Sequence, residues 1–165
     1  MSILRRLTTA DAEELTALRV RNRADYARWE PDWDDPDVHY TVEGVRAWID
    51  DGNERFAIVD EGVIAGMISL TGIVRGAMQV AFLGYSVDRE RAGRGLATRA
   101  SAESADYGFG DLGLHRIEAG TAVENAASQR VLVKNRFTKV GLMRQNVLIS
   151  GRWVDHFLWE RLAGD

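Results

Sequence analysis

The 165-residue chain contains no cysteine, which excludes disulfide bonds, a cysteine nucleophile, and zinc or iron–sulfur sites built on cysteine ligands. It also lacks any apolar run close to the roughly 20 residues that a membrane-spanning helix requires. Charged residues at Arg5, Arg6, Asp11 and Glu13 interrupt the region where a signal peptide would have its apolar segment. These absences predict a cytoplasmic protein that does not act at a membrane.

An excess of positive charge is also absent. The chain has 21 Lys and Arg residues against 25 Asp and Glu residues, a formal net charge of −4 at pH 7. General nucleic-acid binding needs a basic surface that neutralises phosphates, so we exclude it. The length and the 45% hydrophobic content predict one domain over residues 1–165 with a core that needs no disulfide or metal. The length and composition are also compatible with a homodimer.

The two prolines, Pro31 and Pro36, fall in one Trp- and Asp-rich segment, residues 29–37, which predicts a loop. Around this loop the apolar pattern predicts an α+β fold with one central sheet that contains an antiparallel meander. The expected strands are 3–7, 56–59, 63–70, 78–87, 116–119, 137–140 with 143–149, and 153–159. The expected helices are 12–23, 41–50 with Thr41 as N-cap, a helix that follows a glycine turn and ends near 110, and 125–135.

The glycine turn is Arg91-Ala92-Gly93-Arg94-Gly95-Leu96-Ala97-Thr98, and it connects the strand that ends at Val87 to the next helix. Two glycines allow the backbone to bend and to approach a ligand closely. The first amides of a helix have no partner inside it, and the helix dipole is positive at that end. This arrangement predicts a binding site for phosphate groups such as a pyrophosphate.

Two common phosphate-binding motifs fit the turn poorly. A dinucleotide fingerprint needs a third small residue where Thr98 stands, and it belongs in a parallel βαβ unit rather than a meander. A P-loop ends in Gly-Lys-Ser or Gly-Lys-Thr, and neither triplet occurs in the chain. On this motif alone, a glycine turn without any ligand is an equally open interpretation.

A second polar motif, Asn125-Ala-Ala-Ser128, follows about thirty residues later. Asn125 and Ser128 are three residues apart on the predicted helix, so they lie on one face. One interpretation is a helix N-cap beside an exposed serine. The other is a pair of polar groups that contacts the same ligand as the glycine turn.

Together these motifs resemble the GCN5-related N-acetyltransferases (GNAT), specifically the RimJ/RimL-like branch of ribosomal-protein N-acetyltransferases. Three positions depart from the family pattern. Glu90 replaces a Gln or Arg, Arg136 replaces a glycine, and Val133 replaces a tyrosine that is a common general acid in the family. The matching segments follow the family's order through nearly the whole chain: Asn22 with Trp29-Glu30-Pro31, Leu83 to Val87, Arg91 to Thr98, Leu114 to Ala119, Asn125 to Phe137, and Trp153-Val-Asp155.

The resemblance implies the GNAT fold, a central and mostly antiparallel twisted sheet with one splayed parallel strand pair and helices on both faces. It implies acetyl-CoA as co-substrate, no metal, and direct transfer of the acetyl group to a primary amine. Ser128 is then the candidate proton donor to the departing thiolate, or only a hydrogen-bonding group, and Asn125 orients the cofactor or a water. The other expected cofactor contacts are backbone groups of Tyr85, Ser86 and Val87 for the pantetheine arm, and amides of Arg91, Ala92, Gly93, Arg94, Gly95, Leu96 and Ala97 for the pyrophosphate.

The sequence leaves the acceptor amine open. A protein N-terminus, an aminoacyl conjugate and a small amine such as a polyamine all fit, and a non-catalytic acyl-CoA-binding module is the alternative to an enzyme. An unrelated nucleotide-binding protein is a weaker third interpretation. The 29–37 loop is either an acidic aromatic wall that attracts a cationic amine or a solvated loop anchored by its tryptophans. No general base stands out, since an ordinary structural or surface role fits each of Glu118, Asp155, His39, His115 and His156.

Overall fold

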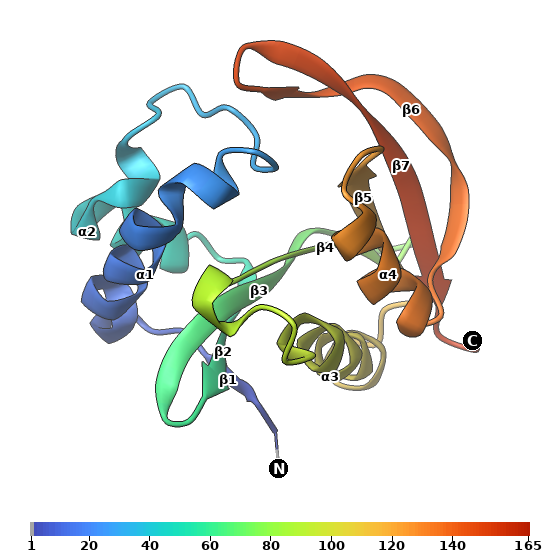
Figure 1. Cartoon of the computed structure of the whole chain (residues 1–165). Coiled ribbons are helices and arrows are strands. Elements are labelled where there is room, and N and C mark those ends of the chain that lie inside the picture. Colours follow the sequence, from blue (N-terminus) through green and yellow to red (C-terminus); the bar gives the residue numbers. More distant parts are fainter. Residues whose placement is uncertain (1) are drawn as a thin grey trace.

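The computed structural model describes residues 2–165, whose strands form one seven-stranded sheet in the order β1-β2-β3-β4-β5-β7-β6 (Figure 1). Neighbouring strands are antiparallel except β4 and β5, which are parallel. The strands are β1 (Leu4–Arg6), β2 (Glu54–Asp60), β3 (Val63–Val74), β4 (Val80–Val87), β5 (Arg116–Ala122), β6 (Thr138–Ile149) and β7 (Arg152–Leu162).

Helices cover both faces of this sheet. Two helices pack on one face through a cluster that includes Leu15, Leu18 and Val45, and the other two cover the opposite face. This arrangement confirms the predicted α+β fold with one parallel strand pair. The helices are α1 (Ala12–Tyr26) and α2 (Val42–Ile49) on the first face, and α3 (Leu96–Gly110) and α4 (Ala126–Lys134) on the second. Thr41 caps α2 as predicted, because its hydroxyl accepts a hydrogen bond from the Gly44 amide at 3.1 Å.

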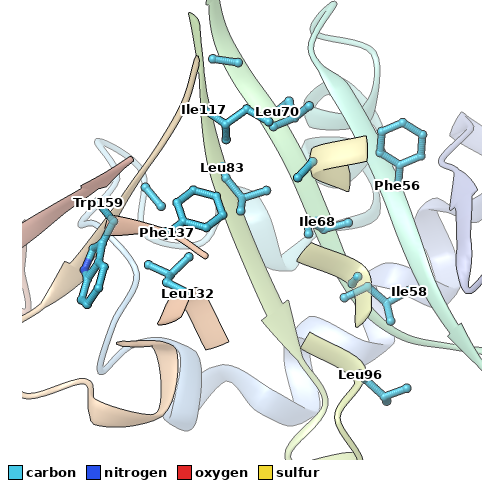
Figure 2. Packing of buried hydrophobic residues seen from close by; sticks show 14 of the residues in the cluster. Phe56, Ile58, Ile68, Leu70, Leu83, Leu96, Ile117, Leu132, Phe137 and Trp159 are labelled. Carbon is cyan, nitrogen blue, oxygen red and sulfur yellow. The ribbon is translucent and has the colours of Figure 1, made fainter. Parts of the chain in front are cut away.

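The larger core lies between the sheet and the α3–α4 layer (Figure 2). Leu70, Ile117 and Leu132 belong to it and are almost completely buried. Burial of each such side chain stabilises the fold by about 1.5–3 kcal/mol. Because the cluster contains residues from β2 through β5, from β7 and from both helices, it fixes α3 and α4 relative to the strands on either side of the parallel pair.

Helix α3 approaches the sheet closely because its inner face carries small residues. Ser101 and Ser104 are fully buried, and a Cβ atom on Gly108 would lie only 2.9 Å from Cδ1 of Ile117. A larger side chain at Gly108 would therefore require the Ile117 side chain or the helix to shift. The close packing sets the position of the helix N-terminus beyond the end of β4.

Several predicted elements differ from the structure in their bounds: strands β3, β5 and β7 each extend three or four residues beyond their predicted ends. Helix α1 continues to Tyr26 rather than ending at Arg23, and the Tyr26 side chain is buried. The two extended segments expected at 137–140 and 143–149 form a single strand, β6. The pairing of β6 with β7 continues through two register shifts, between Lys139 and Gly141 and between Met143 and Val147, and these irregularities interrupt the alternating pattern in the sequence.

Strands β4 and β5 separate after four residue pairs. Val80 to Leu83 pair with Arg116 to Ala119, and no pairing between these two strands continues beyond that point. The rest of β4, Gly84 to Val87, pairs only with β3. In such a strand alternate backbone N–H and C=O groups point away from the existing partner, so this stretch of β4 has an open hydrogen-bonding edge inside the sheet.

Candidate active site

A cavity of about 850 Å³ lies where β4 and β5 separate. Its lining extends from the glycine turn and α4 on one face of the sheet to α1, the 29–37 loop and the β6–β7 hairpin on the other. Of the predicted site residues, only Arg94 does not line this cavity. The lining includes Tyr85, Ser86, Val87, Arg91, Ala92, Gly93, Gly95, Leu96, Ala97, Asn125 and Ser128.

The glycine turn adopts the backbone conformation that its glycines permit. Gly93 and Gly95 have φ angles of 80° and 77°, in the left-handed region that other L-residues rarely adopt. Gly95 is the N-cap of α3 and has no side chain that could accept the first amides of the helix. The amides of Arg91 and Ala92, in contrast, already donate to the carbonyls of Asp88 and Arg89 at 2.9 and 3.1 Å. The donors best suited to a phosphate group therefore begin at Gly93.

The two arginines of the turn are held by the β2–β3 hairpin. Arg91 forms ion pairs with Asp60 at 2.5 Å and Glu61 at 3.1 Å, and Arg94 pairs with the same two carboxylates at 3.0 and 3.4 Å. The hydrogen bonds that Arg91 donates to Asp60 and Glu61 raise the pKa of Arg91 above its ordinary value. The Arg94 guanidinium is thus directed at the hairpin, which explains why it does not line the cavity.

A buried network attaches the start of the turn to α1. Asp88 is 3% exposed, and its carboxylate accepts hydrogen bonds from Arg21 at 2.7 Å and Asn22 at 3.1 Å. The Asn22 side-chain oxygen in turn accepts the Arg89 amide at 2.9 Å. Burial alone would raise the pKa of Asp88, but the bonds from Arg21, Asn22 and the Glu90 amide outweigh it and lower this pKa. Asn22 therefore positions the backbone that leads into the glycine turn.

Next to α4, the hydroxyl groups of Tyr85 and Ser128 lie 2.7 Å apart. Burial raises the pKa of Tyr85 to about 12, despite the opposing hydrogen bond with Ser128, so Tyr85 keeps its proton at neutral pH. When Tyr85 donates to the Ser128 oxygen, the serine proton is free to be donated elsewhere. Asn125 is the N-cap of α4, and its side-chain oxygen accepts the Ser128 amide at 3.1 Å. The pair can therefore deliver a proton into the cavity.

The opposite end of the cavity is lined by aromatic side chains, and an arginine and a glutamate there form an ion pair with each other. Arg19 is 4% exposed and makes two bonds to the Glu30 carboxylate, at 2.8 and 3.2 Å. The rings of Trp33 and His39 meet edge to face with centroids 4.2 Å apart. Burial, together with the nearby charges of Arg19 and Arg55, lowers the pKa of His39. All five side chains line the cavity.

The 29–37 loop is fastened to the tip of the β6–β7 hairpin. The Asp32 carboxylate accepts the amides of Ser150 and Gly151, both at 2.7 Å, and the Asp32 amide donates to the Leu148 carbonyl at 2.8 Å. Figure 1 shows the hairpin tip bending toward this loop, far from α3. Trp29 and Trp33 line the cavity, whereas Asp34 and Asp35 do not. A ligand in the cavity can therefore meet Trp29, Glu30, Pro31 and Trp33 of the loop, but not Asp34 or Asp35.

Sequence reasoning missed many side chains of this cavity, and three of them bear on its chemistry. The phenol of Tyr85 faces Ser128, a residue 43 positions away. Tyr26 and His156 also line the cavity, although the sequence-based prediction gives His156 only a structural or surface role and does not include Tyr26. Strand alternation assigns Tyr85 to the same face as Leu83, toward α4, and this signal could have located its phenol. The matching segment Trp153-Val-Asp155 directly precedes His156.

Two features of other protein classes are absent from residues 2–165. In that part of the chain, no three His, Asp or Glu side chains cluster in a way that could hold a metal ion. None of its helices combines the length and the apolar character that crossing a membrane demands.

Comparison with known proteins agrees with this geometry. The family model described as "Acetyltransferase (GNAT) domain" matches residues 2–138, most of the chain. The chain belongs to the GNAT acetyltransferase family. It is an acetyl-CoA-dependent N-acetyltransferase, which transfers an acetyl group to an amine. The GNAT interpretation of the sequence motifs is thereby confirmed.

Relatives with extensive coverage place the chain in the RimJ/RimL-like branch. The Probable N-acetyltransferase YjcK of Bacillus subtilis is 41% identical over 164 residues, covering 93% of this chain and 89% of the relative. The [Ribosomal protein uS5]-alanine N-acetyltransferase of Escherichia coli is 30% identical over 166 residues, covering 94% and 84%. The structure of Mycobacterium smegmatis RimJ in complex with CoA-disulfide matches with a TM-score of 0.89 and 32% identity, covering 98% of this chain and 81% of that one.

Proposed function

We propose that this acetyltransferase modifies the α-amine of an exposed, flexible protein N-terminus. The observation that carries the proposal is the composition of the cavity, which has a phosphate-binding turn at one end and an aromatic end with paired charges at the other. The uS5-alanine acetyltransferase relative, whose name gives a protein alanine as its target, supports the same acceptor class. A single domain over residues 1–165 and a cytoplasmic location belong to the proposal.

The charges that line the cavity disfavour a polyamine. Asp25 and Glu30 are its only carboxylates, and each faces an arginine: Asp25 is 3.5 Å from Arg89, and Glu30 is 2.8 Å from Arg19. The distal ammonium groups of a polyamine would therefore meet carboxylates that are already paired. An N-terminal α-amine needs no second anionic partner, and its peptide chain can lie along the aromatic side chains.

The need to deprotonate the acceptor amine also favours an α-amine over a polyamine. An α-amine has a pKa of about 8, whereas an alkyl ammonium group has one of about 10.4. At neutral pH roughly one α-amine in ten is uncharged, compared with fewer than one alkyl amine in a thousand. A site without a strongly activated base is therefore better suited to an α-amine.

Within this proposal the predicted residues have distinct roles. Amides from Gly93 to Ala97 hold the pyrophosphate of acetyl-CoA, and the open edge of β4 at Tyr85, Ser86 and Val87 binds the pantetheine arm as an added strand. Ser128, with the Tyr85 hydroxyl behind it, protonates the departing thiolate. Asn125 positions Ser128 through the α4 N-cap.

The test is an acetyl-CoA thiol-release assay with a matched panel of acceptors. Each peptide is offered with a free N-terminus, with a blocked N-terminus and an internal lysine, and with both groups free, alongside spermidine and an aminoacyl nucleotide. We expect turnover only with free N-termini and, by mass spectrometry, a single acetyl group on the α-nitrogen. Faster turnover of spermidine or of the lysine-only peptide would overturn the proposed acceptor.

A further inference from the structure

His156 lies on β7 beside the point where β4 and β5 separate. It is 6% exposed, pairs in register with Ala122 at the end of β5, and lines the cavity. Gly120 of β5 lies beside its ring and beside Phe82, since a Cβ atom on Gly120 would be 3.8 Å from Cδ2 of His156 and 3.2 Å from Cζ of Phe82. The side chain is thus a buried imidazole at the cavity wall.

A hydrogen bond fixes the tautomer of this ring. Nδ1 of His156 lies 3.1 Å from the carbonyl oxygen of Val154. A carbonyl oxygen can only accept, so Nδ1 carries the proton and the neutral ring keeps its lone pair on Nε2. Within residues 2–165, Nε2 has no protein hydrogen-bond partner. This nitrogen is available to accept a proton from a molecule in the cavity.

His156 and Ser128 lie on opposite faces of the sheet. Phe157 and Trp159 pack into the core beneath α3 and α4, so strand alternation turns His156 to the face covered by α1 and α2. Tyr85 shares the α4 face with Leu83, and its hydroxyl contacts Ser128. An acyl group in the gap between the strands would therefore have a proton donor on one side and an unprotonated imidazole nitrogen on the other.

The other cavity histidine, His39, lies in surroundings that disfavour its protonated form. His39 has the guanidinium groups of Arg19 and Arg55 close by, and burial and these charges lower its pKa. Four neighbours of His156 carry no charge: Ala122 and Met143 are in register with it, and Phe82 and Gly120 adjoin its ring. The charged side chains of Arg19, Glu30 and Arg55 line the same cavity. The neighbouring Asp155 directs its carboxylate to the Gln145 amide at 2.7 Å.

We propose that His156 Nε2 is the general base that deprotonates the acceptor amine, directly or through one water. The inference rests on the proposed function. The substrate ammonium gives one proton to Nε2, and the amine nitrogen then bonds to the acetyl carbonyl carbon. As the C–S bond breaks, the thiolate takes a proton from the Ser128–Tyr85 pair, and the second proton lost from nitrogen restores that pair. The proton on Nε2 leaves to solvent.

The experiment compares three single variants, His156→Gln, His39→Gln and His115→Gln, which cover every histidine in the chain. His115 is exposed and does not line the cavity, so it is the matched control. For His156→Gln we expect kcat at pH 7 to fall about 10- to 100-fold with an unchanged acetyl-CoA Kd. The defect should shrink to within about threefold at pH 9, where an α-amine is mostly neutral without help. Added imidazole should restore part of the activity of His156→Ala.

Each other outcome counts against the proposal. A loss in His156→Gln that is equal at all pH values and is not relieved in His156→Ala by imidazole would show a structural role, and a larger loss in His39→Gln would assign the base elsewhere. Turnover of an amine other than an α-amine would overturn only the proposed acceptor, because the variants can be compared on that amine. A wild-type protein that binds acetyl-CoA but acetylates no amine would remove both proposals.

Discussion

The hydroxyl oxygens of Tyr85 and Ser128 lie 2.7 Å apart, although Tyr85 belongs to β4 and Ser128 to α4. If this pair acts as one proton donor, Ser128→Ala and Tyr85→Phe should each lower kcat about 10- to 100-fold and leave the acetyl-CoA Kd within about threefold. Residues that act as a unit give non-additive losses, so the double variant should be no slower than the slower single variant. Steady-state kinetics and calorimetric titration measure both quantities. Multiplicative losses, or normal turnover of Ser128→Ala, would exclude a joint role.

The left-handed conformation of Gly95 should be required for cofactor binding. An alanine there would meet no atom within 4 Å, so its effect comes from backbone strain at φ 77°. That strain costs about 1–2 kcal/mol, which corresponds to a roughly tenfold higher acetyl-CoA Kd if the turn relaxes. Gly113→Ala is the control, because Gly113 has φ 63° and open space but lies outside the cavity. Calorimetry should show weaker binding for Gly95→Ala alone; equal binding by both variants would contradict the assigned role.

The loop contacts make a prediction about the acceptor. Asp34 and Asp35 do not line the cavity, so the Asp34→Asn/Asp35→Asn double variant should leave the KM for the peptide unchanged. Asp32→Ala removes the acceptor of the Ser150 and Gly151 amides, and it should raise this KM about fivefold or more as the hairpin tip loosens. The acetyl-CoA Kd should not change in either case. A higher KM in the double variant would restore the acidic-wall hypothesis.

Asp11 should contribute stability that depends on pH. The hydrogen bond from Arg5, at 2.9 Å, lowers the pKa of Asp11 to about 2, and the Thr8 amide adds to the effect. Because this pKa is lower in the folded state, the contribution is complete above about pH 4 and is lost as the pH falls toward 2. We expect Asp11→Asn to reduce the free energy of unfolding at pH 7 by about 1 kcal/mol, since the exposure of Arg5 weakens the pair.

Urea denaturation at pH 7 and near pH 2 measures this difference. The two proteins should be equally stable at the lower pH. Asp34→Asn, at an exposed carboxylate, should match the wild type at both. A deficit of the same size at pH 7 and pH 2 would show that Asp11 does not act through its charge.

Arg136→Gly should stabilise the protein. Helix α4 ends in a Schellman motif, in which the amides of Arg136 and Phe137 donate to the carbonyls of Val133 and Leu132 at 3.1 and 3.0 Å. This motif holds Arg136 at φ 63°. Relief of that strain, less the entropy cost of glycine, should raise the free energy of unfolding by about 0.5–1 kcal/mol. Arg130→Gly, inside the same helix, should instead lower it by about 1 kcal/mol. Thermal unfolding of both variants measures these changes. A lower melting temperature for Arg136→Gly than for the wild type would contradict the prediction.

The features that could be predicted from the sequence are encoded locally. The period of apolar residues gave the order of helices and strands, and Thr41, Gly93 and Gly95 identified a helix cap and a tight turn from a few neighbouring residues. The pairing of Asn125 with Ser128 is equally local, because both lie in the first turn of one helix. Each of these signals spans fewer than ten residues.

The features that could not be predicted depend on distant segments that folding brings together. Asp32 meets a hairpin 119 positions away, and Arg94 turns to a carboxylate 34 positions away instead of facing the cavity. His156 gains importance only because β7 lies next to β5, a neighbour that a sequence pattern does not specify. A register shift in β6 likewise depends on its partner strand. Tertiary pairing, not local propensity, decided these positions.

The bonds of Asp32 have a consequence for the shape of the acceptor. The N-terminal and C-terminal portions of the molecule are connected through the four residue pairs of β4 and β5, and again through the 29–37 loop and the hairpin tip. Because the cavity lies between these two connections, the protein surrounds the reaction centre as a ring. The cavity is therefore not a cleft that is open along one side. A compact folded surface cannot enter a ring, whereas a slender chain end can thread into it. Accessibility of the first few residues, more than their order, would then select which proteins become acetylated.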